Sequence, residues 1–108
     1  MEIKESDWKV FRRLHSVALE RYCRRVLEEV RAVAECKGDY HDCYRRVHRL
    51  IQVRDKTMAA AFDDPRRSTA FLLLAIMIGE DLLTEEELEQ FSLEAQERID
   101  VIKELRRR

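Results

Sequence analysis

Four residues whose side chains bind zinc lie close together in the first half of the sequence: Cys36, His41, Cys43 and His48. Thiolate and imidazole groups are the usual ligands of structural zinc sites. If residues 40–61 form one helix, His41 and His48 lie two turns apart, roughly 10 Å along the axis, while Cys43 points to the apolar face. Structural sites usually pair their ligands at closer spacing. We therefore expect no bound metal. If the protein does bind one, these four residues are the candidate ligands.

Arg54 and Asp55 are charged residues that interrupt the apolar stripe of the same predicted helix. A charge at the edge of a core is costly unless it is paired or reaches solvent. One interpretation is structural: Arg54 forms an ion pair with an acidic residue of the turn at 63–64 or the turn at 80–81. The other is a small anion site, in which Arg54 holds a carboxylate or phosphate through two hydrogen bonds. We favour the structural interpretation.

The same predicted helix carries Arg45, Arg46 and Arg49, the best candidates for a face that contacts nucleic acid. Elsewhere the arginine charge is compensated by acidic neighbours three or four residues away. One such alternating series consists of Glu20, Arg24, Glu28, Arg31 and Glu35. The sequence has no helix-turn-helix signature and no aromatic residues interleaved with the basic ones. A nucleic-acid-associated regulator is therefore an alternative hypothesis rather than the leading one.

Motifs of known catalytic sites are missing from the sequence. It contains no glycine-rich phosphate loop, no serine nucleophile elbow and no His-Glu-x-x-His pair. The acidic run at 85–89 lacks the alternating aspartates and the glycine of a calcium-binding loop. We expect neither enzymatic activity nor a cofactor.

The elements that position these residues are predicted to be helices only. Charged residues make up 40% of the chain, there are two glycines and one proline, and no segment alternates apolar and polar residues as a half-buried strand does. Asp39, Thr84 and Ser92 are each predicted to cap a helix N-terminus, and Thr84-Glu85-Glu86-Glu87 matches a capping box. Gly38 is predicted to end the helix before Asp39 in a left-handed conformation. Asp64-Pro65 is predicted to start a helix over 65–78.

The first 37 residues carry two apolar stripes about a third of a turn apart. We expect a break near His15-Ser16, with Ser6 or Asp7 capping the first helix and Ser16 capping a second over 17–37. A short turn then forces the helices over 17–37 and 40–61 to run antiparallel. The predicted fold is all-α, a compact bundle of five to six helices built on this central hairpin, in one domain spanning 1–108.

Charge and cysteine content limit the cellular setting. Residues 1–60 carry 14 basic and 10 acidic residues, whereas residues 61–108 carry 7 and 12, so the two halves differ in sign. This pattern can favour docking of the two halves on each other, or of two copies head to tail. The three cysteines and the absence of an export signal predict a cytoplasmic protein with free thiols and no disulfide. The longest apolar run, 70–78, is too short to cross a membrane.

That apolar run is hydrophobic around the whole helix circumference. A helix of this kind is buried on all sides, either in the core or at an interface with another chain. The residues expected to contribute to an interface are Phe71, Leu72, Leu74, Ile76, Ile78, Leu82 and Leu83.

Several segments of the chain resemble a set of short bacterial all-helical proteins with no established function. The segments are 18–23, 50–55, 61–64, 82–84 and 91–92. The resemblance implies a bacterial, cytoplasmic setting and brings no catalytic residue with it. Our leading hypothesis is a non-enzymatic helical interaction module that forms a homodimer or binds another protein. The alternatives are the nucleic-acid-associated regulator and a protein that binds a small anion or a metal.

Overall fold

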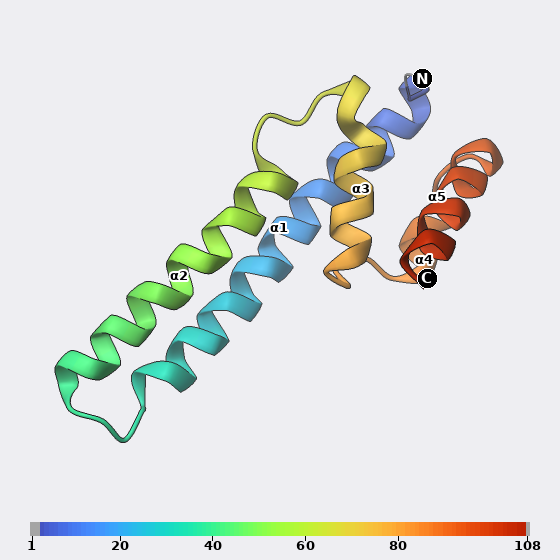
Figure 1. Ribbon diagram of the computed structural model, residues 1–108. Coiled ribbons are helices and arrows are strands. Elements are labelled where there is room, and N and C mark those ends of the chain that lie inside the picture. Colours follow the sequence, from blue (N-terminus) through green and yellow to red (C-terminus); the bar gives the residue numbers. More distant parts are fainter. Residues whose placement is uncertain (1–2, 108) are drawn as a thin grey trace.

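All regular structure in residues 3–107, the part of the chain that the computed structural model describes, is helical (Figure 1). The α-helices are α1 (Glu5–Ala34), α2 (Tyr40–Phe62), α3 (Ala70–Gly79), α4 (Glu85–Leu88) and α5 (Leu93–Arg106). A short 3-10 turn, Arg67–Thr69, precedes α3. The all-α prediction is confirmed.

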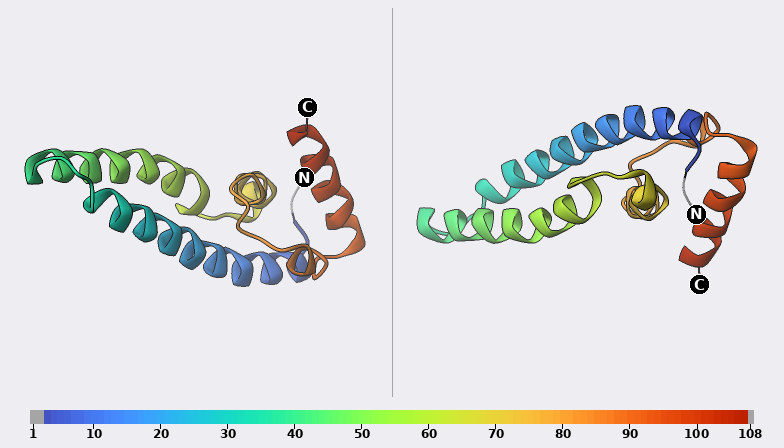
Figure 2. Two further views of the ribbon diagram at one scale, coloured as in Figure 1. Left: turned by 90° about the horizontal axis from the view of Figure 1, so that it is seen from below. Right: turned by 90° about the horizontal axis from the view of Figure 1, so that it is seen from above.

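α1 is one uninterrupted helix of 30 residues, so the predicted break near His15-Ser16 is wrong, and so is the capping role of Ser16. The caps proposed at Ser6 and Asp7 are also wrong, because the helix begins at Glu5. The buried positions of α1 recur every three or four residues: Trp8, Phe11, Leu14, Ala18, Tyr22 and Val26. Successive parts of this stripe face different helices, α3 near the N-terminus and α2 further along (Figure 2). A straight helix can therefore bury both sets of apolar residues.

α1 and α2 run antiparallel and extend away from the other helices (Figures 1 and 2). We call residues 23–55 the arm, and residues 3–22 and 56–107 the head. The molecule measures 54 × 28 × 21 Å, with a radius of gyration of 16.6 Å. A compact chain of this length would have a radius of gyration of about 13 Å. The expected compact bundle with a central hairpin is therefore not what is observed, because much of the hairpin lies outside the head.

Of the two predictions for the turn at the tip of the arm, the cap at Asp39 is confirmed and the left-handed Gly38 is wrong. Asp39 caps α2 as predicted, since the Asp42 backbone N–H donates to its Oδ1 at 2.7 Å. Gly38 does not adopt a left-handed conformation, and α1 has already ended four residues earlier, at Ala34. The turn is therefore longer than the sequence suggests.

The linker between α2 and α3 is also longer than predicted. Asp64 adopts a left-handed conformation with φ of 48°, which Asp tolerates better than most residues. The helix expected to begin at Pro65 begins at Ala70, after the 3-10 turn. The linker carries the chain across the end of α2 so that α3 follows α2 along the same side of α1 (Figure 2).

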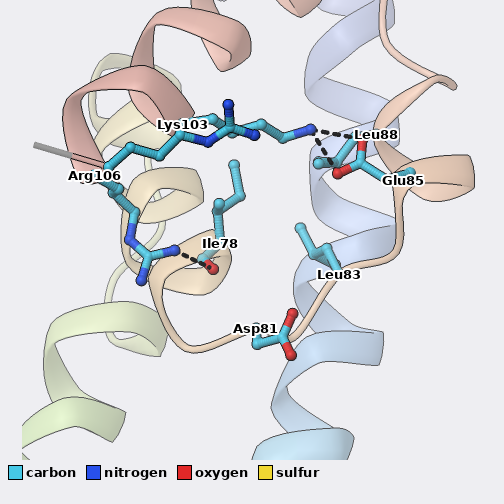
Figure 3. Close-up of a pocket in the computed structure, with 8 residues that line it drawn as sticks. Ile78, Asp81, Leu83, Glu85, Leu88, Lys103 and Arg106 are labelled. Carbon is cyan, nitrogen blue, oxygen red and sulfur yellow. Dashed lines mark hydrogen bonds and ion pairs between the residues drawn. The ribbon is translucent and has the colours of Figure 1, made fainter.

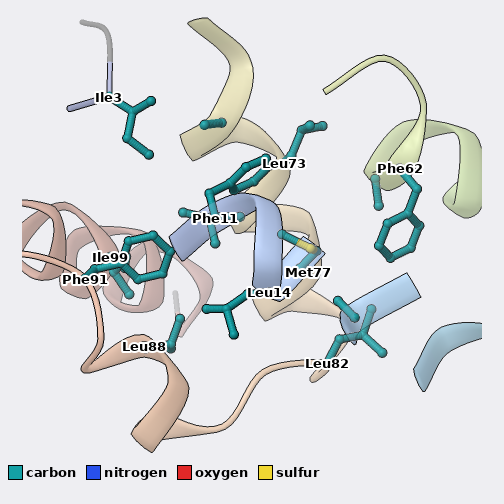
Figure 4. Close-up of a cluster of buried hydrophobic side chains, with 14 of the residues drawn as sticks. Ile3, Phe11, Leu14, Phe62, Leu73, Met77, Leu82, Leu88, Phe91 and Ile99 are labelled. Carbon is teal, nitrogen blue, oxygen red and sulfur yellow. The ribbon is translucent and has the colours of Figure 1, made fainter. Parts of the chain in front are cut away.

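The core lies in the head, around α3. Leu74 and Met77 are fully buried, and Leu73 nearly so. They pack with side chains of α1 and with Leu88, Phe91 and Ile99 from the C-terminal part of the chain (Figure 4). α3 is therefore chiefly a core helix, which explains most of its apolar circumference.

Side-chain caps determine where the two C-terminal helices begin. Thr84 and Glu87 form the predicted capping box: the Glu87 N–H donates to Thr84 Oγ1 at 3.1 Å, and the Thr84 N–H donates to Glu87 Oε1 at 2.9 Å. Ser92 caps α5 as predicted, accepting a hydrogen bond from the Ala95 N–H. Across residues 3–107, no helix is long and apolar enough to cross a membrane.

Candidate interaction surface

The cysteines proposed as zinc ligands form a disulfide, Cys36–Cys43, with Cα atoms 5.8 Å apart. The expectation of free thiols is therefore wrong for this pair, whereas Cys23 is free. Because α1 ends at Ala34, Cys36 lies in the turn and reaches the first turn of α2. His41 and His48 are exposed. The described residues contain no group of three or more His, Cys, Asp or Glu side chains arranged to hold a metal ion.

Arg54 pairs with Glu29 of α1 and not with either predicted turn. Its Nη2 and Nε atoms donate to the two carboxylate oxygens at 2.7 and 3.2 Å. These hydrogen bonds raise the pKa of Arg54 and lower the pKa of Glu29. With the guanidinium occupied by an internal carboxylate, the geometry supports the structural interpretation over an anion site. Asp55 is exposed beside it.

The candidate nucleic-acid residues lie on the surface of the arm. Arg45, Arg46 and Arg49 are all exposed, and the Arg46 Nε lies 3.0 Å from a carboxylate oxygen of Asp42. Part of this basic surface is therefore compensated, and no feature of the described arm beyond these arginines favours nucleic acid.

The seven predicted interface residues divide into core and surface. Two are buried, Leu74 and Leu82, and do not contribute to a surface. Four are half-buried: Phe71, Ile76, Ile78 and Leu83. Leu72 is 63% exposed and is the only large, strongly exposed side chain among the seven.

Leu72 lines an open groove between α3 and α5. The groove has a volume of about 440 Å³, and its lining residues are Phe71, Leu72, Ala75, Arg98, Val101 and Ile102. Val101 is 59% exposed and Leu105, one turn further along α5, is 62% exposed. We call the groove together with Leu105 the α3–α5 face. Apolar side chains make up this face except for one guanidinium.

The one cation in the groove, Arg98, is unmatched. Its guanidinium lies over the Phe71 ring, 4.1 Å from the ring centroid. Its Nη1 atom is buried and has no hydrogen-bond partner within residues 3–107. The α3–α5 face therefore has apolar walls, with one guanidinium packed on Phe71 and its Nη1 buried beneath the surface.

A second pocket of the head, about 330 Å³, lies where α5 meets the end of α3 (Figure 3). Two of its three lining cations, Lys103 and Arg106, already have internal partners. Lys103 contacts both carboxylate oxygens of Glu85, at 2.6 and 2.7 Å. Arg106 donates to the carbonyl oxygens of Ile78 and Gly79, satisfying the free C-terminal carbonyls of α3. Lys103 and Arg106 therefore serve to join helices at this pocket.

Sequence reasoning missed two polar contacts that hold the head together. Asp7, buried in α1, accepts hydrogen bonds from the N–H and Oγ of Ser92 at 2.8 and 2.7 Å. Arg21 donates to both carboxylate oxygens of Glu87 at 2.6 and 2.9 Å, which lowers the pKa of Glu87 to about 2. Both contacts join residues more than 60 positions apart, which no local pattern reveals.

Val101 and Leu105 were also missed as surface residues, because the sequence indicates that α5 has apolar positions but not which of them are covered. Val101 lies three residues after Arg98 and Leu105 four residues after Val101, and this spacing is the only sequence signal that they share one strip of the helix. The α3–α5 face is thus the best candidate site in the head. No protein-family model, curated protein or solved structure matches this chain.

Proposed function

We propose that this protein is a helical interaction module that associates with further copies of itself. The observation that supports it is the α3–α5 face, where Leu72, Val101 and Leu105 are exposed around an apolar groove. Exposed apolar side chains that gather around a groove are typical of protein interaction sites.

The charge around this face supports a second copy as the occupant. Residues 70–106, the segment that forms the face, carry 10 acidic and 3 basic residues. An acidic region favours a basic partner surface, because opposite potentials attract during encounter. The first 60 residues of the chain itself have a net charge of +4, from 14 basic and 10 acidic residues.

Light scattering across a concentration series tests this function. The wild-type mass should rise above the 13.0 kDa of one chain as the concentration increases. Leu72→Lys should weaken association at least about tenfold, because it removes an apolar contact and places a cation against a basic partner.

The matched control is Leu93→Lys. Leu93 is the most exposed leucine of α5, at 80%, and does not line the groove. This variant should associate like the wild type. A wild-type mass that stays at one chain at all concentrations would contradict the proposal, and so would equal weakening by both variants.

A further inference from the structure

The arm carries more apolar surface than its two helices cover. Val33, Val47 and Leu50 face the partner helix but are only half-buried, because no third helix of residues 3–107 packs on the arm. Next to them, Tyr44 is 70% and Leu27 is 66% exposed. A helix that packs in a bundle usually has an apolar face of this width, whereas a helix that packs on a single partner helix has a narrower apolar face.

Apart from Val53, the exposed large apolar residues of the arm lie on one side of it: Leu27, Tyr40, Tyr44 and Ile51. On α1, Cys23 follows the buried Tyr22, and on α2, Tyr44 follows the buried Cys43. In two right-handed helices that run antiparallel, the residues that follow the contact positions lie on the same side of the pair. We call this side the arm face, formed by Cys23, Leu27, Val30, Tyr40, Tyr44 and Ile51.

We infer that the arm face docks on the α3–α5 face of a second copy, so that the chains associate head to tail. This inference rests on the proposed function, which supplies the head half of the contact, and adds the surface that fills it. Val53, on the other side of α2, is 51% exposed and lies outside the proposed contact.

Charge favours this pairing over the two symmetric ones. The arm, residues 23–55, carries 8 basic and 6 acidic residues, whereas residues 70–106 carry 3 and 10. A contact between two α3–α5 faces would bring two copies of the acidic segment 70–106 together, and a contact between two arms would join two weakly basic regions. Only the head-to-tail arrangement brings regions of opposite charge together.

The side chains of the two faces also match. The groove offers apolar walls, among them Phe71, on which the Arg98 guanidinium is stacked. The arm face offers two tyrosines, Tyr40 and Tyr44, of which Tyr40 is 96% exposed. Tyrosine joins an apolar ring, which can pack on the walls of the groove, to a hydroxyl that can stay in contact with water.

A head-to-tail contact leaves one free face at each end of a pair. Further copies can therefore add until the rotation between neighbours closes a ring, or the chain of copies stays open. A symmetric dimer would stop at two copies. This difference makes the arrangement testable by mixing variants.

The experiment combines a head variant, Leu72→Lys, with an arm variant, Tyr44→Glu, which places an acid against the acidic head. Each variant alone should have the mass of one chain, 13.0 kDa, where the wild type associates. Mixed in equal amounts, they should form pairs and go no further, because one intact arm meets one intact head. Val53→Glu, the matched arm control, should assemble like the wild type, and circular dichroism checks that each variant is folded.

Each other outcome has a distinct meaning. If Leu72→Lys weakens association but Tyr44→Glu does not, the proposed function stands and the arm inference is overturned. If Tyr44→Glu alone weakens it, the contact is between arms, and both proposals about the α3–α5 face fail. If each variant is monomeric and the mixture stays monomeric, the head-to-tail arrangement is overturned.

Discussion

Single polar contacts join segments of the head that are distant in sequence. The pair of Arg21 and Glu87 connects the middle of α1 to α4, and Arg21 also donates to the Leu82 carbonyl at 2.8 Å. Asp7 connects the start of α1 to the cap of α5 through Ser92. A buried carboxylate needs such partners, because an unpaired one is strongly destabilising. These residues therefore determine how the short C-terminal helices sit on α1.

The Arg21–Glu87 pair gives stability a defined pH dependence. Hydrogen bonds from Arg21 and Thr84 lower the pKa of Glu87 from its ordinary 4.5 to about 2. The folded state thus favours the ionised form, so the stabilisation is complete above about pH 4.5 and is lost as the pH falls towards 2. Glu87→Gln should lower the free energy of unfolding at pH 7, and the difference from the wild type should shrink below pH 4.5. Urea unfolding followed by the fluorescence of Trp8, the single tryptophan, measures this.

Glu86 provides the control for this prediction. It lies in the same helical turn, is exposed and makes no ion pair among the described residues. Glu86→Gln should change stability little at any pH. A constant difference between the wild type and Glu87→Gln from pH 7 to pH 2 would contradict the assigned role of Glu87.

At the scale of elements, the arm is the part of the molecule with the least support. Within residues 3–107 it has two helices and no third layer, and beyond Tyr22 only Val26 and Cys43 are buried. The Cys36–Cys43 disulfide closes the tip where α1 has ended and α2 begins. A crosslink there reduces the number of conformations open to the unfolded arm, and in the folded state it holds the first turn of α2 in place.

Reduction of this disulfide should destabilise the protein. A crosslink that closes a loop of this length contributes about 2–3 kcal/mol, chiefly by restricting the unfolded chain. Urea unfolding with and without a dithiol reductant should show this loss for the wild type. The double variant Cys36→Ser, Cys43→Ser should match the reduced wild type and not respond to reductant, while Cys23→Ser should behave like the wild type. Equal stability of the oxidised and reduced wild type would contradict this role.

At the scale of the whole molecule, charge and shape are organised along the same axis. The 54 Å long axis has the weakly basic arm at one end, and the acidic residues of α3 to α5 belong to the head at the other. An elongated molecule with opposite charge at its two ends favours head-to-tail contacts. This arrangement underlies the proposed assembly.

The assembly should therefore weaken with salt. The Debye length falls from about 10 Å at 0.1 M salt to about 3 Å at 1 M, which screens attraction between the acidic head and the basic arm. The average mass measured by light scattering at fixed protein concentration should fall as sodium chloride is raised over this range. The mixed pair of head and arm variants should show the same trend. An assembly that is unchanged or larger at 1 M salt would show that charge does not drive the contact.

The sequence by itself determined the features that depend on neighbouring residues. The all-α class and the caps at Asp39, Thr84 and Ser92 were predictable, because a cap is made by side chains within three or four residues of the helix start. The charge difference between the halves of the chain was also visible in the sequence.

Tertiary structure alone decided the features that depend on where helices cross. α1 is unbroken because α3 and α2 pack on successive parts of its apolar stripe. Cys36 can reach Cys43 because α1 ends before Cys36, which leaves this residue in the turn. It also gave Arg54 its partner Glu29 and divided the apolar residues of α3 between the core and the exposed Leu72. Local patterns fix which residues of a helix are apolar, but coverage of each one depends on the crossing of helices far apart in sequence, so the candidate surface became visible only in three dimensions.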